Sequence, residues 1–415
     1  MRLSEHTDVA AFRGYRRAFV LCAALGLAAG ALGGPSAQTT PTPSASGRWV
    51  TTWATAQQLA PTRVAFGGRE QPPPPPAHAR IPATLADQTI RMIARLSIGG
   101  RRVRIRLSNA LEKTPLQLGA AHVAIRSSGP STVPASDRPL TFGGRSSIIV
   151  PPGVVVLSDP VELDVPARSE LAISLYPPAD TGPPTVHPDG LHTAYLAQGN
   201  ATGRATLDVT ATTTAYLWLS AIDVLAPMTA GTIVAFGDSI TDGMGTTLDT
   251  DRAWASLLAA KLSTGRRTAA LGVANVGLSG NRLLRHGFGV SALARFDRDV
   301  LGLAGVRWMI VLLGINDITF PALPGMPPTE AVTAEDLIWG LTQIVERAHV
   351  HGINVAGATI LPVEGVSTYT ESGEAIRQAV NQPRAQPLIS RLSPWLVARV
   401  SWARFARLGP LCSLA

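Results

Sequence analysis

The sequence predicts two folds in succession, a β-sandwich of jelly-roll type over residues 48–225 and a doubly wound α/β sheet over residues 231–382. The first region contains many short runs of alternating polar and apolar residues separated by proline and glycine, which is typical of a sandwich. After Gly231 the pattern changes to apolar strand, loop and amphipathic helix, which favours a parallel sheet. Small and polar residues follow the apolar runs of this second region, where open α/β sheets bind their ligands.

Two runs in the first region predict a β-hairpin. Thr89–Leu96 and Arg102–Leu107 alternate polar and apolar residues on either side of Gly99-Gly100. Alternate side chains of the second run would face the core, while its arginines would face solvent. The core-facing set is Val103, Ile105 and Leu107. Further short strands are expected at Leu116–Ile125, Gly153–Leu157, Glu170–Leu175 and Ala215–Leu219.

The second region begins with a buried strand at Ile233–Phe236, after which Gly237 lets the chain turn where a Cβ would clash. A helix is expected near Trp254–Leu262. Its apolar face would consist of Trp254, Leu257, Leu258 and Leu262. Further strands are expected at Trp308–Leu313 and Asn354–Ile360, and further helices at Ala334–His349 and Gly373–Asn381.

The distribution of charge argues against a nucleic-acid partner. The chain has 415 residues and a net charge of +8 at pH 7. Residues 1–37 carry +2 and residues 383–415 carry +5, which leaves only +1 on the body of the chain. Because no basic face emerges from that body, nucleic acid is excluded as a partner.

The N-terminus resembles an export signal. Arg13, Arg16 and Arg17 precede an apolar run over Ala18–Leu32, which predicts a signal peptide within residues 1–37. The run is short for a membrane span, although an uncleaved anchor is the alternative. A periplasmic or secreted protein is therefore expected, with no stable membrane span once the signal is removed.

Composition defines two further segments. Residues 38–47 are rich in Thr, Pro and Ser, which predicts a flexible linker. Pro72–Pro76 is expected to form a stiff exposed loop, with a ligand for a partner domain as the alternative. Removal of the signal would take Cys22 and leave Cys412, so no intrachain disulfide is expected.

Three segments contain the candidate chemistry. Ser239 follows the first strand of the second region, Gly280 follows the apolar segment around Val276, and Asn316 follows the strand ending at Leu313. The carboxyl ends of parallel strands meet at one edge of a sheet, so the three residues could meet there. Taken singly, Gly280 could mark a simple turn and Asn316 the cap of a strand end.

In this order, the blocks GTIVAFGDSITDG, ANVGLSGN and IVLLGIND resemble the SGNH (GDSL) hydrolase family, whose sheet is flavodoxin-like. The resemblance implies Ser239 as the nucleophile. It also implies an oxyanion hole made by the backbone N–H groups of Ser239 and Gly280 and the side-chain amide of Asn316. No metal or cofactor is implied. Asp238 and Asp317 are expected to support these loops through backbone hydrogen bonds, without a catalytic role.

The sequence departs from the family in the segment that should supply the general base for the serine. The family supplies it from a C-terminal Asp-x-x-His block, but the last histidine here is His351 and the last aspartate is Asp336. The abrupt change of composition over residues 383–415 suggests a frameshifted tail, so a weak or inactive chain is expected. Asp189 and His192 match the Asp-x-x-His pattern inside the first region; this match is interpreted as accidental, although the two residues could border a cleft.

The expected function is that of an exported serine esterase that removes a short, acetyl-like acyl group through an acyl-enzyme on Ser239. The substrate would be a small-molecule or glycan ester, with carbohydrate esters suggested by analogy with exported family members that carry a β-domain. Two alternatives stay open: a non-catalytic protein whose residues 48–225 bind a glycan, and an acyltransferase. The sequence does not define the oligomeric state.

Overall fold

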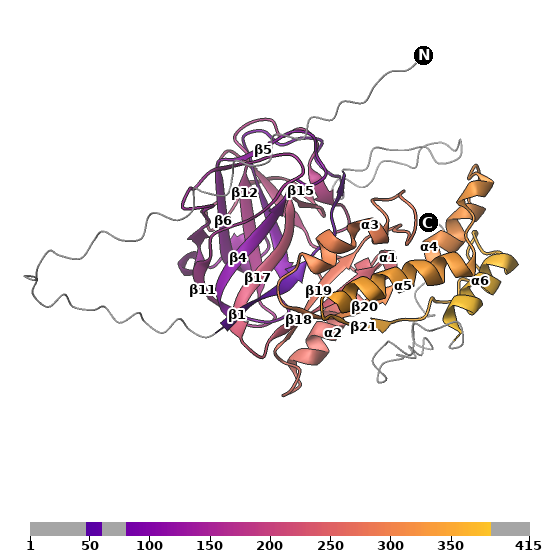
Figure 1. Ribbon diagram of the computed structural model, residues 1–415. Helices are drawn as coiled ribbons and strands as arrows, with labels where there is room; N and C mark the ends of the chain where they lie inside the picture. The colour runs from indigo at the N-terminus through magenta and orange to yellow at the C-terminus, as the bar shows by residue number, and fades with distance from the viewer. Residues whose placement is uncertain (1–46, 60–79, 383–415) are drawn as a thin grey trace, which may run out of the picture. The chain divides into compact units, whose positions relative to one another are not determined.

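The computed structural model describes residues 47–59 and 80–382, which belong to one compact unit (Figure 1). The predictions of a signal peptide over 1–37, a stiff loop at Pro72–Pro76 and an aberrant tail over 383–415 lie outside the described residues. An antiparallel β region extends to Pro227, and a parallel sheet begins at Gly231.

The β region consists of two large and two small antiparallel sheets among its described residues. The first large sheet contains, in spatial order, β1 (Gly47–Ala54), β17 (Leu219–Pro227), β4 (Gly100–Ser108) and β10 (Val155–Leu157), with β11 (Val161–Val165) also on β4. The second contains β15 (Val209–Thr213), β14 (Ala194–Gln198), β3 (Gln88–Arg95), β12 (Glu170–Tyr176), β6 (Ala120–Ser128) and β7 (Ser131–Thr132), with β8 (Arg138–Pro139) on β6. The small sheets are β16 (Tyr216–Leu217), β13 (Thr185–His187) and β2 (Gln58–Leu59), and β5 (Leu116–Leu118) with β9 (Ile148–Val150).

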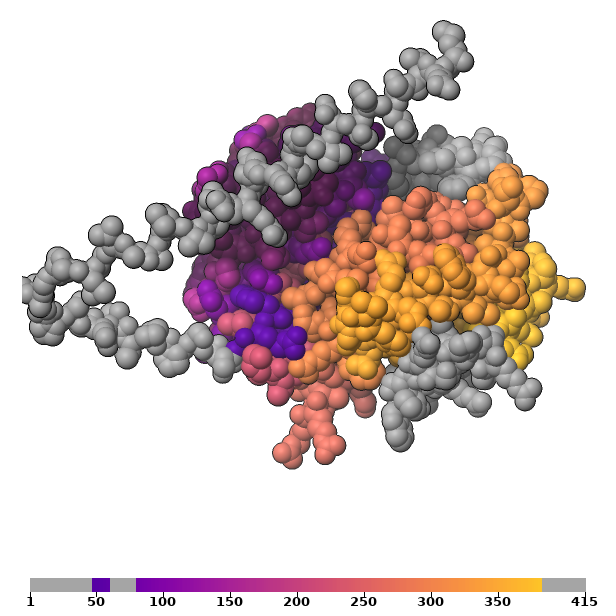
Figure 2. All heavy atoms as spheres, in the orientation of Figure 1, coloured from indigo at the N-terminus to yellow at the C-terminus, as the bar shows by residue number. Residues whose placement is uncertain are grey.

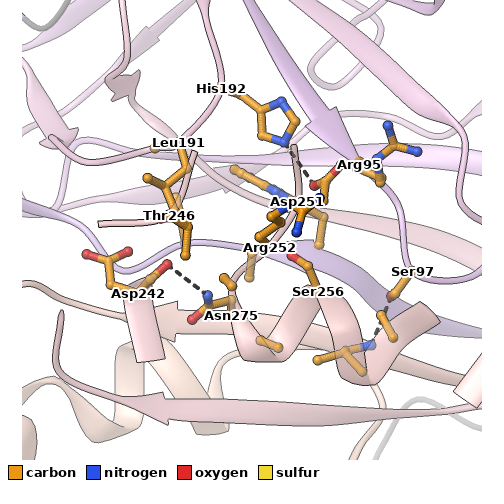
Figure 3. Close-up of a pocket in the computed structure, with 18 of the residues that line it drawn as sticks. Arg95, Ser97, Leu191, His192, Asp242, Thr246, Asp251, Arg252, Ser256 and Asn275 are labelled. Carbon is orange, nitrogen blue, oxygen red and sulfur yellow. Dashed lines mark hydrogen bonds and ion pairs between the residues drawn. The ribbon is translucent and has the colours of Figure 1, made fainter. Parts of the chain in front are cut away.

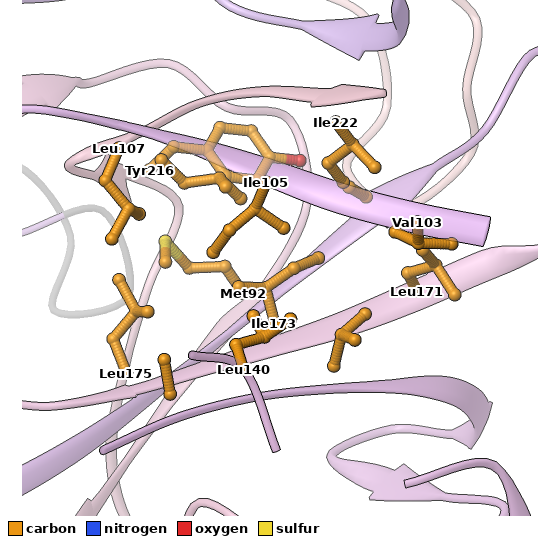
Figure 4. Packing of buried hydrophobic residues seen from close by; sticks show 14 of the residues in the cluster. Met92, Val103, Ile105, Leu107, Leu140, Leu171, Ile173, Leu175, Tyr216 and Ile222 are labelled. Carbon is orange, nitrogen blue, oxygen red and sulfur yellow. The ribbon is translucent and has the colours of Figure 1, made fainter. Parts of the chain in front are cut away.

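Side chains from both large sheets form one buried hydrophobic cluster (Figure 4). Val103, Ile105 and Leu107 of β4 are fully buried in it, which confirms the predicted core-facing positions. Met92 of β3 and Ile173 of β12, from the other large sheet, belong to the same cluster. The removal of this apolar surface from water is the main source of stability for the β region.

The predicted hairpin around Gly99-Gly100 is wrong. β3 pairs with β12 and β14, whereas β4 pairs with β17, β10 and β11 in the other large sheet. Leu96 and Ile98 of the connection are buried in the shared core, so the chain crosses from one sheet to the other. Two alternating strands that bury one face in the same core show the same sequence pattern whether they are neighbours or lie in different sheets.

Two other predicted strands are interrupted. Leu116–Ile125 divides at Gly119 into β5 and β6, which belong to different sheets. Ala215–Leu219 divides at Trp218, which has a φ of 57° and separates β16 from β17. Left-handed backbone at a bulky residue is rare, so a propensity argument favours one continuous strand at that position.

The second region contains a parallel sheet of spatial order β19 (Leu271–Gly277), β18 (Gly231–Gly237), β20 (Val306–Leu312) and β21 (Asn354–Gly357). All of its strand pairs are parallel, which confirms the predicted α/β class. Successive residues of β18 face opposite sides of the sheet. Ile233 packs with α2 (Trp254–Ser263) on one side, and Phe236 on the other side belongs to the cluster that contains residues of α5 (Ala334–Val350). Helices therefore cover both faces of the sheet.

The remaining helices are α1 (Ser239–Asp242), α3 (Ala292–Phe296), α4 (Ile315–Thr319) and α6 (Glu371–Asn381). In the space-filling view, α5 and α6 form much of the orange-to-yellow surface (Figure 2). Leu257 is 50 % exposed, so the predicted apolar face of α2 does not include it. Within residues 47–59 and 80–382, no helix is long and apolar enough to span a membrane.

The β region and the parallel sheet share buried hydrogen bonds. Thr232 Oγ1 donates to the Thr51 carbonyl over 2.9 Å, and the Val273 N–H donates to Ser97 Oγ over 2.9 Å. Arg106 does not face solvent as predicted: its guanidinium donates to the carbonyls of Gly302 and Arg298. The face of β4 that carries the arginines therefore also contacts the second region, at Arg298 and Gly302.

Candidate active site

Ser239 is the first residue of α1, directly after β18. Asp238 caps this short helix, its Oδ1 accepting the Ile240 N–H over 3.0 Å. A Cβ on Gly237 would collide with the Thr241 side chain and the Leu312 carbonyl, so only glycine allows α1 to begin this close to the strand. The carboxyl end of β18 thus presents the serine on a tight strand-to-helix turn.

Gly280 lies in the loop after β19 and has a φ of 72°. This left-handed backbone is the reason for a glycine at the position. The preceding residue, Ser279, donates its N–H and its hydroxyl to Asp242 Oδ2, over 3.0 and 2.9 Å. Because Asp242 is the last residue of α1, these bonds join the Gly280 loop to the helix that begins with Ser239.

Asn316 lies in α4, directly after β20 and behind Gly314, whose φ is 114°. Its side chain is buried, and Nδ2 donates to the Asn281 carbonyl over 2.9 Å. An amide nitrogen carries two hydrogens, so the second remains for another acceptor. The structure therefore joins the loops of Ser239, Gly280 and Asn316 at one edge of three adjacent strands; their catalytic roles stay predictions.

Asp317 supports the same edge. Its carboxylate accepts the backbone N–H groups of Leu283 and Leu284, over 2.7 and 3.0 Å. Burial raises the pKa of Asp317 to about 6 and the pKa of Asp238 to about 7. Both carboxyl groups make the backbone hydrogen bonds expected from the sequence, and neither donates to or accepts from Ser239 Oγ.

Arg295 of α3 is a buried cation at this edge that the sequence did not predict. Its guanidinium donates to the carbonyls at the ends of two strands, Gly237 of β18 and Val276 of β19, each over 2.8 Å, and to Asn281 Oδ1 over 2.9 Å. It is 1 % exposed and pairs with Asp299 over 3.1 Å. Burial lowers its pKa, an effect that Asp299 opposes. The only sequence signal is one arginine within an otherwise apolar helical turn.

No described histidine bonds to Ser239. His122 pairs with Asp137, His192 with Asp251, and His286 accepts the Ser291 N–H through Nδ1. His349 lies in the last turn of α5 and His351 directly follows that helix, so both precede the start of β21 and lie away from the carboxyl ends of the strands. Within the part of the chain that the structure describes, the serine is therefore placed without a general base.

The sequence did not predict a role for His187. In the Asp189-x-x-His192 match, His192 pairs with Asp251 rather than with Asp189. His187 Nε2 lies 3.0 Å from Asp242 Oδ1, and both side chains are buried. His192 Nε2 lies 3.0 Å from Asp251 Oδ1. Asp189 and His192 do border a cleft between the β region and α2, lined also by Asp242, Asn275 and Arg95 (Figure 3). Its internal volume is about 80 Å³, room for a few water molecules.

No group of three or more His, Cys, Asp or Glu side chains in the described residues is arranged to hold a metal ion. The cleft's charged groups pair with one another instead. Asp251 binds both His192 and Arg95, and Arg95 also binds Glu170. Burial opposes ionisation of Asp251, but the hydrogen bond from His192 and the charge of Arg95 bring its pKa below the usual value.

Residues 235–386 match the family model described as GDSL-like lipase/acylhydrolase. Among solved structures, the chain is similar to the SGNH-hydrolase family esterase AlinE4, at 21% identity over 36% of this chain and 70% of that one, with a TM-score of 0.28. It is also similar to a lipolytic protein of the G-D-S-L family from Desulfitobacterium hafniense, at 22% identity over 39% of this chain and 73% of that one, with a TM-score of 0.27. A third similar structure is that of an acetylxylan esterase from Geobacillus stearothermophilus, at 19% identity over 36% of this chain and 70% of that one, with a TM-score of 0.29. These identities and TM-scores are too low to bear on substrate or mechanism. No curated protein matches the chain significantly.

Residues 235–386 are a domain of the GDSL-like lipase/acylhydrolase family. Ser239, Gly280 and Asn316 all fall inside the matched segment, in the order that the family resemblance requires.

Proposed function

We propose that the protein is a serine esterase of the SGNH type that hydrolyses short-chain, acetyl-like esters. One observation carries the proposal: Asp242–Ser279 and Asn316–Asn281 hydrogen bonds tie the three predicted catalytic loops together at one sheet edge. The family of residues 235–386 supports hydrolysis of an acyl bond. The alternative of a scaffold without catalysis does not explain why a serine, a left-handed glycine and a buried amide converge there.

In the proposed reaction, Ser239 Oγ attacks the ester carbonyl carbon and forms the new C–O bond. The carbonyl oxygen becomes an oxyanion, which the N–H groups of Ser239 and Gly280 and one Asn316 hydrogen would stabilise. Loss of one such donor typically costs ~10²–10³ in rate. The bond to the leaving alcohol then breaks, the alcohol takes up the serine proton, and water releases the acid from the acyl-enzyme.

We propose further that this chain turns over slowly, because a serine hydroxyl needs a base. His122, His187, His192 and His286 contact other groups, and His349 and His351 lie at the end of α5, away from Ser239. Residues 383–415 contain neither histidine nor aspartate. Removal of the histidine from a serine protease triad costs ~10⁶ in kcat. A frameshift in the segment after Gln382 remains our explanation for this departure from the family.

Added imidazole tests both parts of the proposal, because it can replace a missing base from solution. Imidazole also cleaves p-nitrophenyl acetate by itself, so the Ser239-dependent rate is the rate of the full chain minus that of Ser239→Ala at the same imidazole concentration. We expect this difference to be small without imidazole and to rise as imidazole is added. Asn316→Ala should lower the rescued rate by ~10²–10³. Fast turnover without imidazole would contradict the impairment alone. The absence of any Ser239-dependent rate, with or without imidazole, would contradict the esterase.

The proposal also includes the class of substrate, the fold type of the β region and the location of the protein in the cell. We propose a carbohydrate ester as substrate, for which acetate release from acetylated xylan would be compared with release from p-nitrophenyl acetate. The shared core of the two large sheets supports a sandwich of jelly-roll type for the β region. The arginine-preceded apolar run within residues 1–37 supports export to the periplasm or medium.

A further inference from the structure

His187 is fixed by two acceptors. It ends β13 and is 2 % exposed. Nδ1 lies 2.7 Å from the Ala56 carbonyl oxygen, and Nε2 lies 3.0 Å from Asp242 Oδ1. A carbonyl oxygen only accepts hydrogen bonds, and so does an ionised carboxylate, so both ring nitrogens act as donors. This geometry fits the imidazolium form, which has one N–H for each acceptor.

The charges around His187 agree with that form. Burial opposes it, but Asp242, then Asp189 and the Ala56 carbonyl, raise the pKa of His187 above the usual value. Its aromatic neighbour Tyr216 has its ring centroid 6.4 Å away. The β region thus places a buried histidine of raised pKa against the last residue of α1.

Asp242 links His187 to the candidate active site, because each of its carboxylate oxygens contacts one of the two. While Oδ1 faces His187, Oδ2 accepts both the N–H and the hydroxyl of Ser279, the residue before Gly280. A Cβ on Gly277 would collide with the backbone of Asp242, so α1 packs directly on the end of β19. Little room is left for Asp242 to move without moving Ser279.

We propose that His187 is a positioning residue for the oxyanion hole, acting through Asp242 and Ser279 on the backbone N–H of Gly280. This inference rests on the proposed esterase function. It makes the β region a working part of the active site, in addition to any role in recognition. Without the imidazolium, the Asp242 carboxylate would be buried without its cationic partner and would reorient, releasing the Ser279–Gly280 peptide.

The chain contains a matched control for this proposal. His192, five residues after His187, also pairs with an aspartate of the second region over 3.0 Å and is 7 % exposed. Its partner Asp251 bonds onward to Arg95 of β3 and not to a catalytic loop. Loss of this pair removes a comparable contact while leaving Asp242 and Ser279 in place.

The test compares His187→Ala, His187→Gln and His192→Gln in the full chain. The first readout is the amide signal of Gly280 in a protein with carbonyl-labelled serine and amide-labelled glycine, identified by its loss in Ser279→Ala. The second is the imidazole-rescued, Ser239-dependent rate. We expect His187→Ala to shift the Gly280 signal and lower kcat by about 10–100-fold, no more than the lower end of the ~10²–10³ cost of losing one oxyanion donor outright. Glutamine, which can still donate to Asp242, should restore part of the rate, and His192→Gln should change it less than about 3-fold, as expected for a site outside the oxyanion hole.

An unshifted Gly280 signal in folded His187→Ala, or an equal rate loss in His192→Gln, would overturn the proposal. If the signal shifts but no protein shows a Ser239-dependent rate, the loop is positioned by His187 and the esterase function is wrong. If His187→Ala does not fold, His187→Gln and Asp242→Asn replace it, since both keep a polar side chain of similar volume.

Discussion

Two buried histidines of the β region, His187 and His192, each lie 3.0 Å from an aspartate of the second region, and the two aspartates differ in their other contacts. His187 contacts Asp242 of α1, whose other oxygen bonds to Ser279. His192 contacts Asp251, in the loop before α2, whose other oxygen pairs with Arg95 of the β region. The first pair leads into the candidate active site, while the second leads back into the β region, at Arg95.

The contrast teaches that burial and pair type do not determine the consequence of a contact. Both histidines are buried, and both distances are 3.0 Å. What differs is the next hydrogen bond along the chain of contacts. We therefore expect the first pair to affect reaction rate and the second to affect mainly stability.

The largest expected effect comes from Arg295→Met, which removes the buried cation at the carboxyl ends of β18 and β19. Breaking a buried ion pair by removing one partner costs about 3–5 kcal/mol of unfolding free energy. Arg102→Met is the matched control, because the Arg102–Glu162 pair has side chains 39% and 76% exposed and should cost about 0–1 kcal/mol. Urea unfolding measures both. Equal losses would show that Arg295 does not organise the strand ends.

The next effect separates the two pairs by rate. Asp242→Asn should lower the imidazole-rescued, Ser239-dependent rate by up to ~10²-fold, because the Gly280 donor loses its support. Asp251→Asn should leave that rate within about 3-fold while lowering the melting temperature, since no oxyanion donor is disturbed. A larger rate loss in Asp251→Asn than in Asp242→Asn would reverse our assignment of the two pairs.

A smaller effect tests the packing of α1 on β19. Gly277→Ala should cost about 1–3 kcal/mol of unfolding free energy, as is typical of overpacking, because the new methyl group would meet the Asp242 backbone. Gly287→Ala is its control: the nearest atom there is the flexible Arg282 Nη2 at 3.3 Å. Thermal melts of the two variants give the difference, and indistinguishable values would count against tight packing at Gly277.

The last expected effect is a pH dependence at the cap of α1. Burial raises the pKa of Asp238 from 3.8 to about 7, so the folded chain holds this proton between those values and the unfolded chain releases it. The Asp238 contribution to stability is therefore lost as pH rises from about 4 to about 7. Denaturant titrations across this range should show a flatter slope in Asp238→Asn. An unchanged slope would mean that Asp238 is ionised in the folded protein.

The sequence predicted the parallel sheet well because its strands are continuous apolar runs, each followed by small and polar residues. The loops of Ser239, Gly280 and Asn316 could be placed at one edge because parallel strands share their carboxyl ends. The hairpin prediction was wrong because two strands that face one core show the same alternation of polar and apolar residues whether they are neighbours or lie in different sheets. Arg295 and His187 could not be found, because their partners are backbone carbonyls and an aspartate of another region, which leave no spacing pattern.

The most direct test of the central claim is peptide mass spectrometry after incubation with p-nitrophenyl acetate. We expect acetyl on Ser239, less of it in Asn316→Ala, and faster accumulation when imidazole is added. This result would identify the serine as the nucleophile even where turnover is slow. Acetyl on Ser239 that is no more abundant than on the other serines of the same sample, with imidazole present, would contradict the account.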